Sequence, residues 1–146
     1  MPALNDLDAD ELDAAAALAG RLKHDLGKYV AFGARWLDDA ATAEQRKSAL
    51  RDDLLQTRRG PDGTHDALAV WAPYRDALCD ELGLAEEPLV QTLVHAMQSL
   101  ASVIDDLRRD ALPADRVDPS LALARQVSDA CRDLHRRVRA LENDRG

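Results

Sequence analysis

The chain has 146 residues, of which 46% are hydrophobic and 32% are charged, and its formal net charge is −8. This composition is typical of a single soluble domain over residues 1–146, and its acidic balance argues against a nucleic-acid partner, which needs a basic surface. No run of about 18 apolar residues indicates a membrane span, and the acidic N-terminus lacks the features of a signal peptide, so we expect a cytoplasmic protein.

Residue usage favours helices over strands along the whole chain. Alanine, leucine, arginine and acidic residues dominate, whereas valine, isoleucine and threonine are sparse. Neither the alternating pattern of a strand nor an internal repeat is visible. We therefore predict an all-α fold, an antiparallel bundle of roughly four to five helices.

The first helix is predicted over residues 8–37. Acidic residues occupy its first turns, where the helix dipole favours negative charge. Its apolar positions recur every three or four residues and form one stripe, which points to a single face in the core. The stripe consists of Ala15, Leu18, Leu22, Leu26, Tyr29, Gly33 and Trp36.

The second helix is predicted over residues 43–59. Thr42 and Gln45 have the spacing of a capping box, in which each side chain accepts a hydrogen bond from the backbone of the other residue. Gly60 marks the end of this helix, and the following residues to Gly63 have the composition of a turn.

The third helix is predicted over residues 64–82 and ends before Gly83. Pro73 lies inside it and cannot donate the backbone hydrogen bond that a helix interior requires, so we predict a kink or a break there. Its core side is expected to consist of Val70, Trp71, Tyr74, Leu78 and Leu82.

The last two helices have the clearest periodicity. Pro88 suits the first position of the fourth helix, and apolar residues follow it at spacings of three and four. The fifth helix is predicted to begin near Pro119, with Asp118 as its cap. Its heptad seam suits either a bundle interior or a homodimer. The seam consists of Ala124, Val127, Cys131, Leu134, Val138 and Leu141.

Three glycines lie between Gly20 and Gly33, inside the first predicted helix. Each glycine in a helix interior costs roughly 0.5–1 kcal/mol relative to alanine. At about 100° per residue, His24 falls opposite the apolar stripe, with Gly20 and Gly27 one turn before and after it on the same face. The imidazole is therefore predicted to stand clear of its neighbours, open to a bulky protein partner.

The rest of this face is small or basic. Ala31 follows Gly27 by one turn, and Lys28 and Arg35 add positive charge beside the imidazole. The candidate partner-binding residues are therefore Gly20, Gly27, Ala31 and Arg35. The candidate catalytic residues are His24, Asp25 and Lys28.

The segment His24-Asp25-Leu26-Gly27-Lys28 resembles the phosphoacceptor motifs of two signalling families. Histidine phosphotransfer domains carry a motif of the type His-x-Leu-Lys-Gly on an exposed face of a four-helix bundle, and here the glycine and the lysine are reversed. Histidine-kinase phosphoacceptor helices often carry His, an acidic residue and Leu, but the proline that usually follows is missing here. The resemblance covers about ten residues and the bundle architecture.

The resemblance implies a phosphorelay. A ring nitrogen of His24 would take a phosphoryl group from a receiver domain or a histidine kinase and pass it on. The glycines would let the partner approach in line, and Lys28 would screen the phosphate charge. Asp25 would orient the ring or accept a proton. No cofactor is expected.

Two other interpretations of these residues stay open. Small residues such as Gly20 and Gly27 also suit close helix packing, so the chain is alternatively a non-catalytic interaction module, dimeric through its first or last helix. The pair His24-Asp25 also resembles the HD metal-dependent phosphohydrolase signature, with His65, Asp66 and Asp105 as further ligands. That family needs an upstream histidine, and the first 23 residues contain none, so we predict no metal site.

Overall fold

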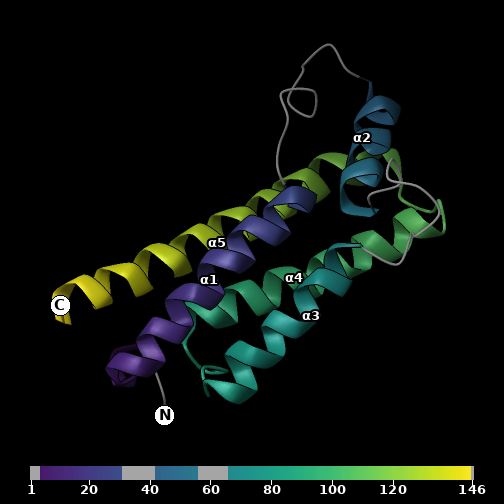
Figure 1. The fold of residues 1–146 in the computed structure, drawn as a ribbon. Coiled ribbons are helices and arrows are strands. Elements are labelled where there is room, and N and C mark those ends of the chain that lie inside the picture. Colours follow the sequence, from purple (N-terminus) through teal and green to yellow (C-terminus); the bar gives the residue numbers. More distant parts are fainter. Residues whose placement is uncertain (1–3, 31–41, 56–65, 146) are drawn as a thin grey trace.

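The computed structural model describes residues 4–30, 42–55 and 66–145, and none of these residues lies in a strand. The predicted all-α class is therefore confirmed. The main helices of the described chain are α1 (Ala9–Val30), α2 (Ala43–Leu55), α3 (Ala67–Asp76), α4 (Pro88–Arg108) and α5 (Val117–Arg145) (Figure 1). Two short 3₁₀ turns also occur, η1 (Leu4–Asp6) and η5 (Ala114–Arg116).

The start of α1 is fixed by a reciprocal cap that precedes the predicted apolar stripe. The backbone N–H of Glu11 donates to Asp8 Oδ1 at 2.8 Å, and that of Asp8 donates to Glu11 Oε1 at 3.1 Å. The core face then follows the stripe, with Leu18 only half-buried. The buried members are Ala15, Leu22, Leu26 and Tyr29. The predicted members Gly33 and Trp36 lie outside the described residues.

The predicted capping box begins α2. The N–H of Gln45 donates to Thr42 Oγ1 at 3.1 Å, and the N–H of Thr42 donates to Gln45 Oε1 at 2.9 Å. The core side of α2 is narrow and centres on Leu50 and Leu54, which are fully buried. The predicted end of this helix and the turn after it lie outside the described residues.

Ion pairs tie α2 to the connection between α4 and α5. The carboxylate of Asp110 lies 2.6 Å from Arg51 Nη2 and 3.5 Å from Lys47 Nζ. Asp110 has a φ of 53°, in the left-handed region that commonly ends a helix. Arg46 pairs with Asp118 of α5 at 2.9 Å. Electrostatic contacts therefore hold α2 across one end of the longer helices (Figure 1).

Of the predicted kink or break at Pro73, the break does not occur, because α3 continues through Pro73 to Asp76, and the kink stays a prediction. Pro73 removes the bond to the carbonyl of Ala69, but both residues are exposed, so water can satisfy that carbonyl. The helical geometry changes only at η4 (Ala77–Glu81), which is a π-helical turn. Gly83 then ends the helical segment with a φ of 68°.

The start of α4 matches the prediction, and α5 starts two residues before Pro119, so that Asp118 lies in its first turn and is not its cap. Pro88 opens α4, and the N–H of Leu89 donates to Glu87 Oε2 at 2.7 Å. However, α5 begins at Val117 because η5 leads directly into it. The heptad seam of α5 is buried inside this chain, apart from the half-buried Leu141, so it does not face a second chain.

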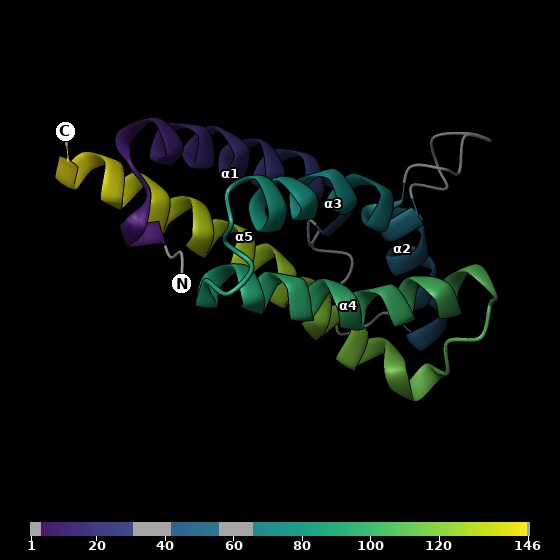
Figure 2. The ribbon, with the colours of Figure 1, turned by 90° about the horizontal axis from the view of Figure 1, so that it is seen from below.

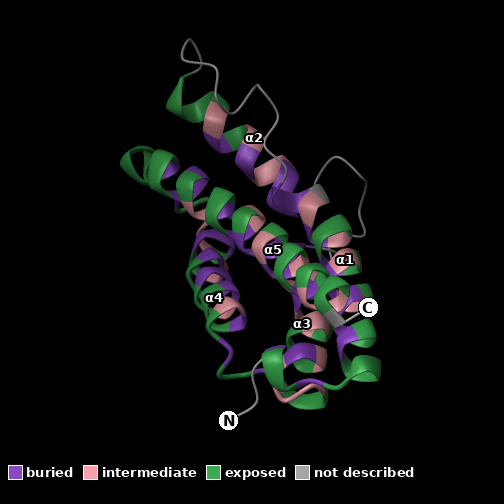
Figure 3. Ribbon diagram, turned by 90° about the vertical axis from the view of Figure 1, so that its left-hand side faces the viewer, coloured by how far each residue is buried: buried purple, intermediate pink, exposed green. Residues whose placement is uncertain are grey.

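The helices share one hydrophobic core. α5 packs on both α1 and α4, and α3 lies beside α1 (Figure 2). Buried residues line the sides of the helices that face one another (Figure 3). This packing is consistent with a helical bundle. Among the described helices, none combines the length and the hydropathy that crossing a lipid bilayer requires.

Candidate functional site

His24 lies on the exposed face of α1. Leu22 and Leu26, two residues before and after it, are fully buried, and they fix the orientation of the helix. Because residues two apart differ by about 200° around a helix, burial of both leucines directs His24 outward. Arg21 and Lys23 are exposed on either side of His24, with Arg21 toward Tyr74 of α3 and Lys23 toward His135 of α5.

The position one turn after His24 is open. Among the residues that the structure describes, no heavy atom would lie within 4 Å of a β-carbon at Gly27. A partner's backbone can therefore approach α1 closely on this side of the imidazole.

The position one turn before His24 is covered. A β-carbon at Gly20 would lie 3.3 Å from Nε2 and 3.8 Å from Cδ2 of His135, which belongs to α5. The first distance is shorter than an ordinary van der Waals contact. Gly20 therefore admits the His135 ring to the α1 backbone, as the close-packing interpretation of the sequence expects.

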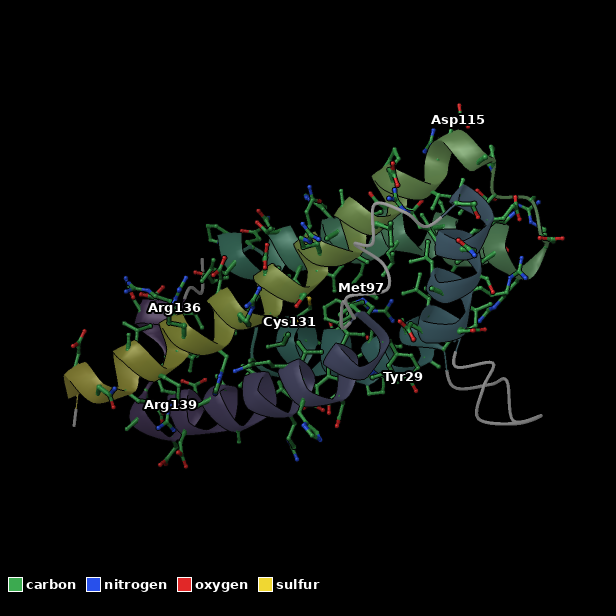
Figure 4. The ribbon with its side chains drawn as sticks, turned by 90° about the horizontal axis from the view of Figure 1, so that it is seen from above. Tyr29, Met97, Asp115, Cys131, Arg136 and Arg139 are labelled. Atoms are coloured by element: carbon green, nitrogen blue, oxygen red, sulfur yellow. The ribbon has the colours of Figure 1, made fainter. Side chains whose placement is uncertain are left out.

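His135 sits among charged groups from both helices. Burial lowers its pKa below the usual value of 6.5, and the positive charges of Lys23 and Arg139 lower the pKa further, whereas Glu142 opposes this shift. Arg139 projects from the side of α5 that faces α1, and Arg136 projects from the other side (Figure 4). The neutral imidazole is therefore the favoured form in the seam between α1 and α5.

Asp25 is directed to α3 and not to His24. Its Oδ2 accepts a hydrogen bond from the Tyr74 hydroxyl. Burial, this hydrogen bond and the charge of Asp25 raise the pKa of Tyr74 to about 12, which keeps the phenol protonated as a donor. The resemblance implied that Asp25 orients the His24 ring or accepts a proton, whereas its hydrogen bond with Tyr74 directs it to α3, because neighbouring residues on a helix diverge by about 100°.

Three predicted residues cannot be assigned to the site. Lys28 belongs to α1, but its side chain lies outside the described residues, as do Ala31 and Arg35 entirely. Their predicted roles beside His24 stay predictions. The face that the structure describes therefore consists of His24 and Gly27, with Gly20 covered by His135.

The residues suggested for a metal site have other partners. Asp66 is 2% exposed, caps α3 by accepting a hydrogen bond from the Ala69 N–H at 2.9 Å, and pairs with Arg108. Asp105 is exposed and pairs with Arg109 at 3.0 Å. His65 lies outside the described residues. In the part of the chain that is described, no group of three or more histidine, cysteine or acidic residues is placed to hold a metal ion.

A groove that the sequence did not indicate runs between α4 and α5, and we call it the α4–α5 groove. One part has a volume of about 530 Å³, and a second part of about 450 Å³ shares Asp133 with it. The small side chains of Ala96 and Ala130 line its floor. Its polar walls include His95, Ser99, Gln126, Asp129, Asp133 and Arg136.

No family model matches the chain, and comparison with curated proteins and with solved structures finds no significant similarity.

Proposed function

We propose that this chain is a histidine phosphotransfer-like signalling protein in which His24 carries the phosphoryl group. The observation that supports this most directly is the exposed imidazole on α1, next to the open space at Gly27. In this proposal α1 is an outer helix of an antiparallel bundle. The partner is the receiver domain of a response regulator or a histidine kinase.

The chemistry requires a neutral imidazole nitrogen that is accessible from outside. That nitrogen attacks the phosphorus of an aspartyl phosphate, a P–N bond forms, and the aspartate carboxylate leaves as the P–O bond breaks. In-line attack needs the donor to reach the ring without obstruction, which the open space at Gly27 allows. The exposed cations Arg21 and Lys23 favour the negative phosphoryl group electrostatically.

Asp25 has a supporting role in this proposal. Its hydrogen bond with Tyr74 holds the carboxylate toward α3. A carboxylate directed at the phosphorylated ring would repel the phosphoryl group, so this orientation favours transfer. Asp25 then contributes by fixing α1 against α3, and proton exchange at His24 takes place with solvent.

The test is phosphoryl transfer from a panel of receiver domains phosphorylated on aspartate. We expect acid-labile, base-stable phosphate on the wild-type chain and none on His24→Gln. His95→Gln is the matched control, because His95 is also an exposed histidine on a helix. Equal labelling of wild type and His24→Gln, or no labelling by any receiver or histidine kinase of the panel, would contradict the proposal.

A second candidate is a helical interaction module without chemistry. The contact between Gly20 and His135 favours it, because packing within the chain already accounts for one of the two glycines that flank His24. In that case His24→Gln leaves the biological activity unchanged. Substitutions that fill the space at Gly27 or the α4–α5 groove then abolish partner binding.

A further inference from the structure

We propose that the seam between α1 and α5 holds the phosphoryl group that His24 carries. The residues that bind it are Lys23 of α1 with Arg132 and His135 of α5. The inference rests on the phosphotransfer proposed for His24, and it adds a binding site that a second helix supplies. Because α5 is distant from His24 in the sequence, the motif around His24 does not indicate this site.

Gly20 is the floor beneath both imidazoles. His135 Nε2 lies 3.3 Å from the place that a β-carbon of Gly20 would occupy. Residues one turn apart on a helix face have β-carbons about 5–6 Å apart, so this nitrogen lies within about 9 Å of the β-carbon of His24. Helical side chains lean toward the N-terminus, over the preceding turn, which here is the turn of Gly20. A phosphoryl group on His24 is therefore directed back toward His135.

The His135 ring is free to bind an anion. In the parts of the chain that the structure describes, neither of its nitrogens takes part in a hydrogen bond, and the residue is half-buried at the edge of the seam. The positive charges of Lys23 and Arg139 act on the ring, whereas Glu142 opposes them. An anion placed here accepts a hydrogen bond from the imidazole and is attracted by both cations.

Arg132 adds a guanidinium on the same side of α5. It lies three residues before His135 and seven before Arg139, which projects toward α1, so the three share one side of the helix (Figure 4). In the antiparallel bundle proposed above, Arg132 is at the His24 end of this group. Its side chain is 61% exposed and pairs with Asp129 of the same helix, a contact that contributes little to stability. The guanidinium can therefore bind a phosphoryl group through two parallel hydrogen bonds.

Positive charge at this seam contrasts with the formal net charge of −8 of the whole chain. Lys23 is exposed, and it has no ion-pair partner among the residues that the structure describes. The carboxylate next to His24 in the sequence belongs to Asp25, which the Tyr74 hydroxyl holds toward α3. An anion at the seam therefore compensates positive charge that the described chain leaves unbalanced.

The first measurement follows the titration of His135 by NMR in protein treated with phosphoramidate, a reagent that phosphorylates accessible histidines without a protein partner. We expect a phosphoryl group on His24 to raise the pKa of His135 by at least about 0.5, because a nearby negative charge favours the protonated ring. In His24→Gln, labelling of His95 should leave the pKa of His135 unchanged. Mass spectrometry identifies the labelled rings.

An unchanged pKa of His135, or label on His95 without label on His24, overturns the proposal. Failure of the proposed function gives a different result. If phosphoramidate labelling of His24 raises the pKa of His135 but no receiver domain or histidine kinase labels His24, the seam binds the phosphoryl group and the signalling role is contradicted.

The second measurement compares two arginines on different sides of α5. The side chains of Arg132 and Arg136 are 61% and 80% exposed, and each pairs with an aspartate three residues before it. We expect Arg132→Gln to slow the labelling of His24 at least about threefold, because the guanidinium stabilises the incoming phosphoryl group. Arg136→Gln should leave the rate unchanged, since Arg136 projects from the other side of the helix (Figure 4). Arg132→Lys keeps the charge and should restore most of the rate.

Labelling of His95 in Arg132→Gln is the internal reference, and far-UV circular dichroism verifies that the variants are folded. Equal rates at His24 in Arg132→Gln and Arg136→Gln show that the α5 side of the seam does not contact the phosphoryl group, and they overturn the proposal.

Discussion

His135 of α5 rests on the backbone of Gly20 in α1, with Nε2 3.3 Å from the place that a β-carbon would occupy. Gly27, two turns further along the same helix, has open space at that position. The two positions therefore carry glycine for different physical reasons, although both glycines lie one turn from His24 in the sequence.

Substitution of each glycine by alanine should change the free energy of unfolding differently at the two positions. Gly27→Ala should stabilise the fold by about 0.5–1 kcal/mol, because alanine is the better helix former and the new methyl group meets nothing. Gly20→Ala should lose this gain, because the methyl group displaces His135. Urea unfolding followed by circular dichroism measures both, and equal stabilisation by the two variants would contradict the packing.

Bulk at Gly27 should block phosphotransfer if a partner approaches there. Gly27→Leu should reduce the rate of phosphorylation by at least about tenfold, because the side chain fills the space needed for in-line approach. Ala14→Leu is the control, since Ala14 is exposed on α1 but lies about 15 Å from His24 along the helix axis. Stopped-flow or gel-based transfer assays measure the rates. Unchanged transfer in Gly27→Leu would show that the partner does not use this space.

The stability of the protein should depend on His135 at mildly acidic pH. Its pKa is lowered in the folded state from 6.5, so below that pH the unfolded chain binds the proton more readily than the folded chain does. The contribution of His135 is therefore complete above pH 6.5 and declines as the pH falls toward the folded-state pKa. His135→Gln should flatten this part of the profile of unfolding free energy against pH. If His135→Gln and the wild type show the same slope, His135 does not cause this pH dependence. His95→Gln serves as the control.

Loss of the Tyr74 hydroxyl should weaken the link between α1 and α3. Tyr74→Phe should lower the free energy of unfolding by about 1 kcal/mol, because Asp25 loses its hydrogen-bond donor. A double-mutant cycle with Asp25→Asn isolates the interaction between the two side chains. If the effects of the two substitutions are simply additive, the hydrogen bond makes no contribution in solution.

Asp66 should contribute far more to stability than Asp105, although each pairs with an arginine. Asp66→Ala removes both the cap of α3 and a buried carboxylate, and should lower the free energy of unfolding by about 2 kcal/mol. Asp105→Ala removes only an exposed pair with Arg109, and should change the free energy of unfolding by less than about 0.5 kcal/mol. Chemical unfolding of both variants measures the difference. Similar losses would mean that the pair, and not the cap, dominates.

The parts of the fold that depend on periodicity could be predicted from the sequence. Apolar spacing in α1 and α5 correctly placed Leu22 and Leu134 in the core, where both are fully buried. The reason is that burial on one face of a helix depends mainly on local spacing. The same reasoning placed His24 on an exposed face, which the structure shows.

Contacts between helices could not be predicted in this way. A helical wheel gives the direction of a side chain, but it does not say which other helix lies there. Tyr74 and Asp25 are 49 positions apart, and nothing in the local pattern of either residue indicates the other. His135 over Gly20 is hidden for the same reason. Pro73 shows a further limit of local rules. Proline leaves the carbonyl of Ala69 without its helical hydrogen bond, and the local sequence does not show that Ala69 is exposed.

The attachment of α2 has a consequence for how the protein opens. Its buried apolar contribution is confined to Leu50, Leu54 and Leu55, and its remaining described links include charged contacts at Asp110 and Asp118 that dissolved salt weakens. Local detachment of this helix therefore requires less free energy than loss of the α1–α4–α5 core. In hydrogen exchange, the backbone amides of α2 are then the first helical amides to take up deuterium, and added salt accelerates them before it affects those of α5.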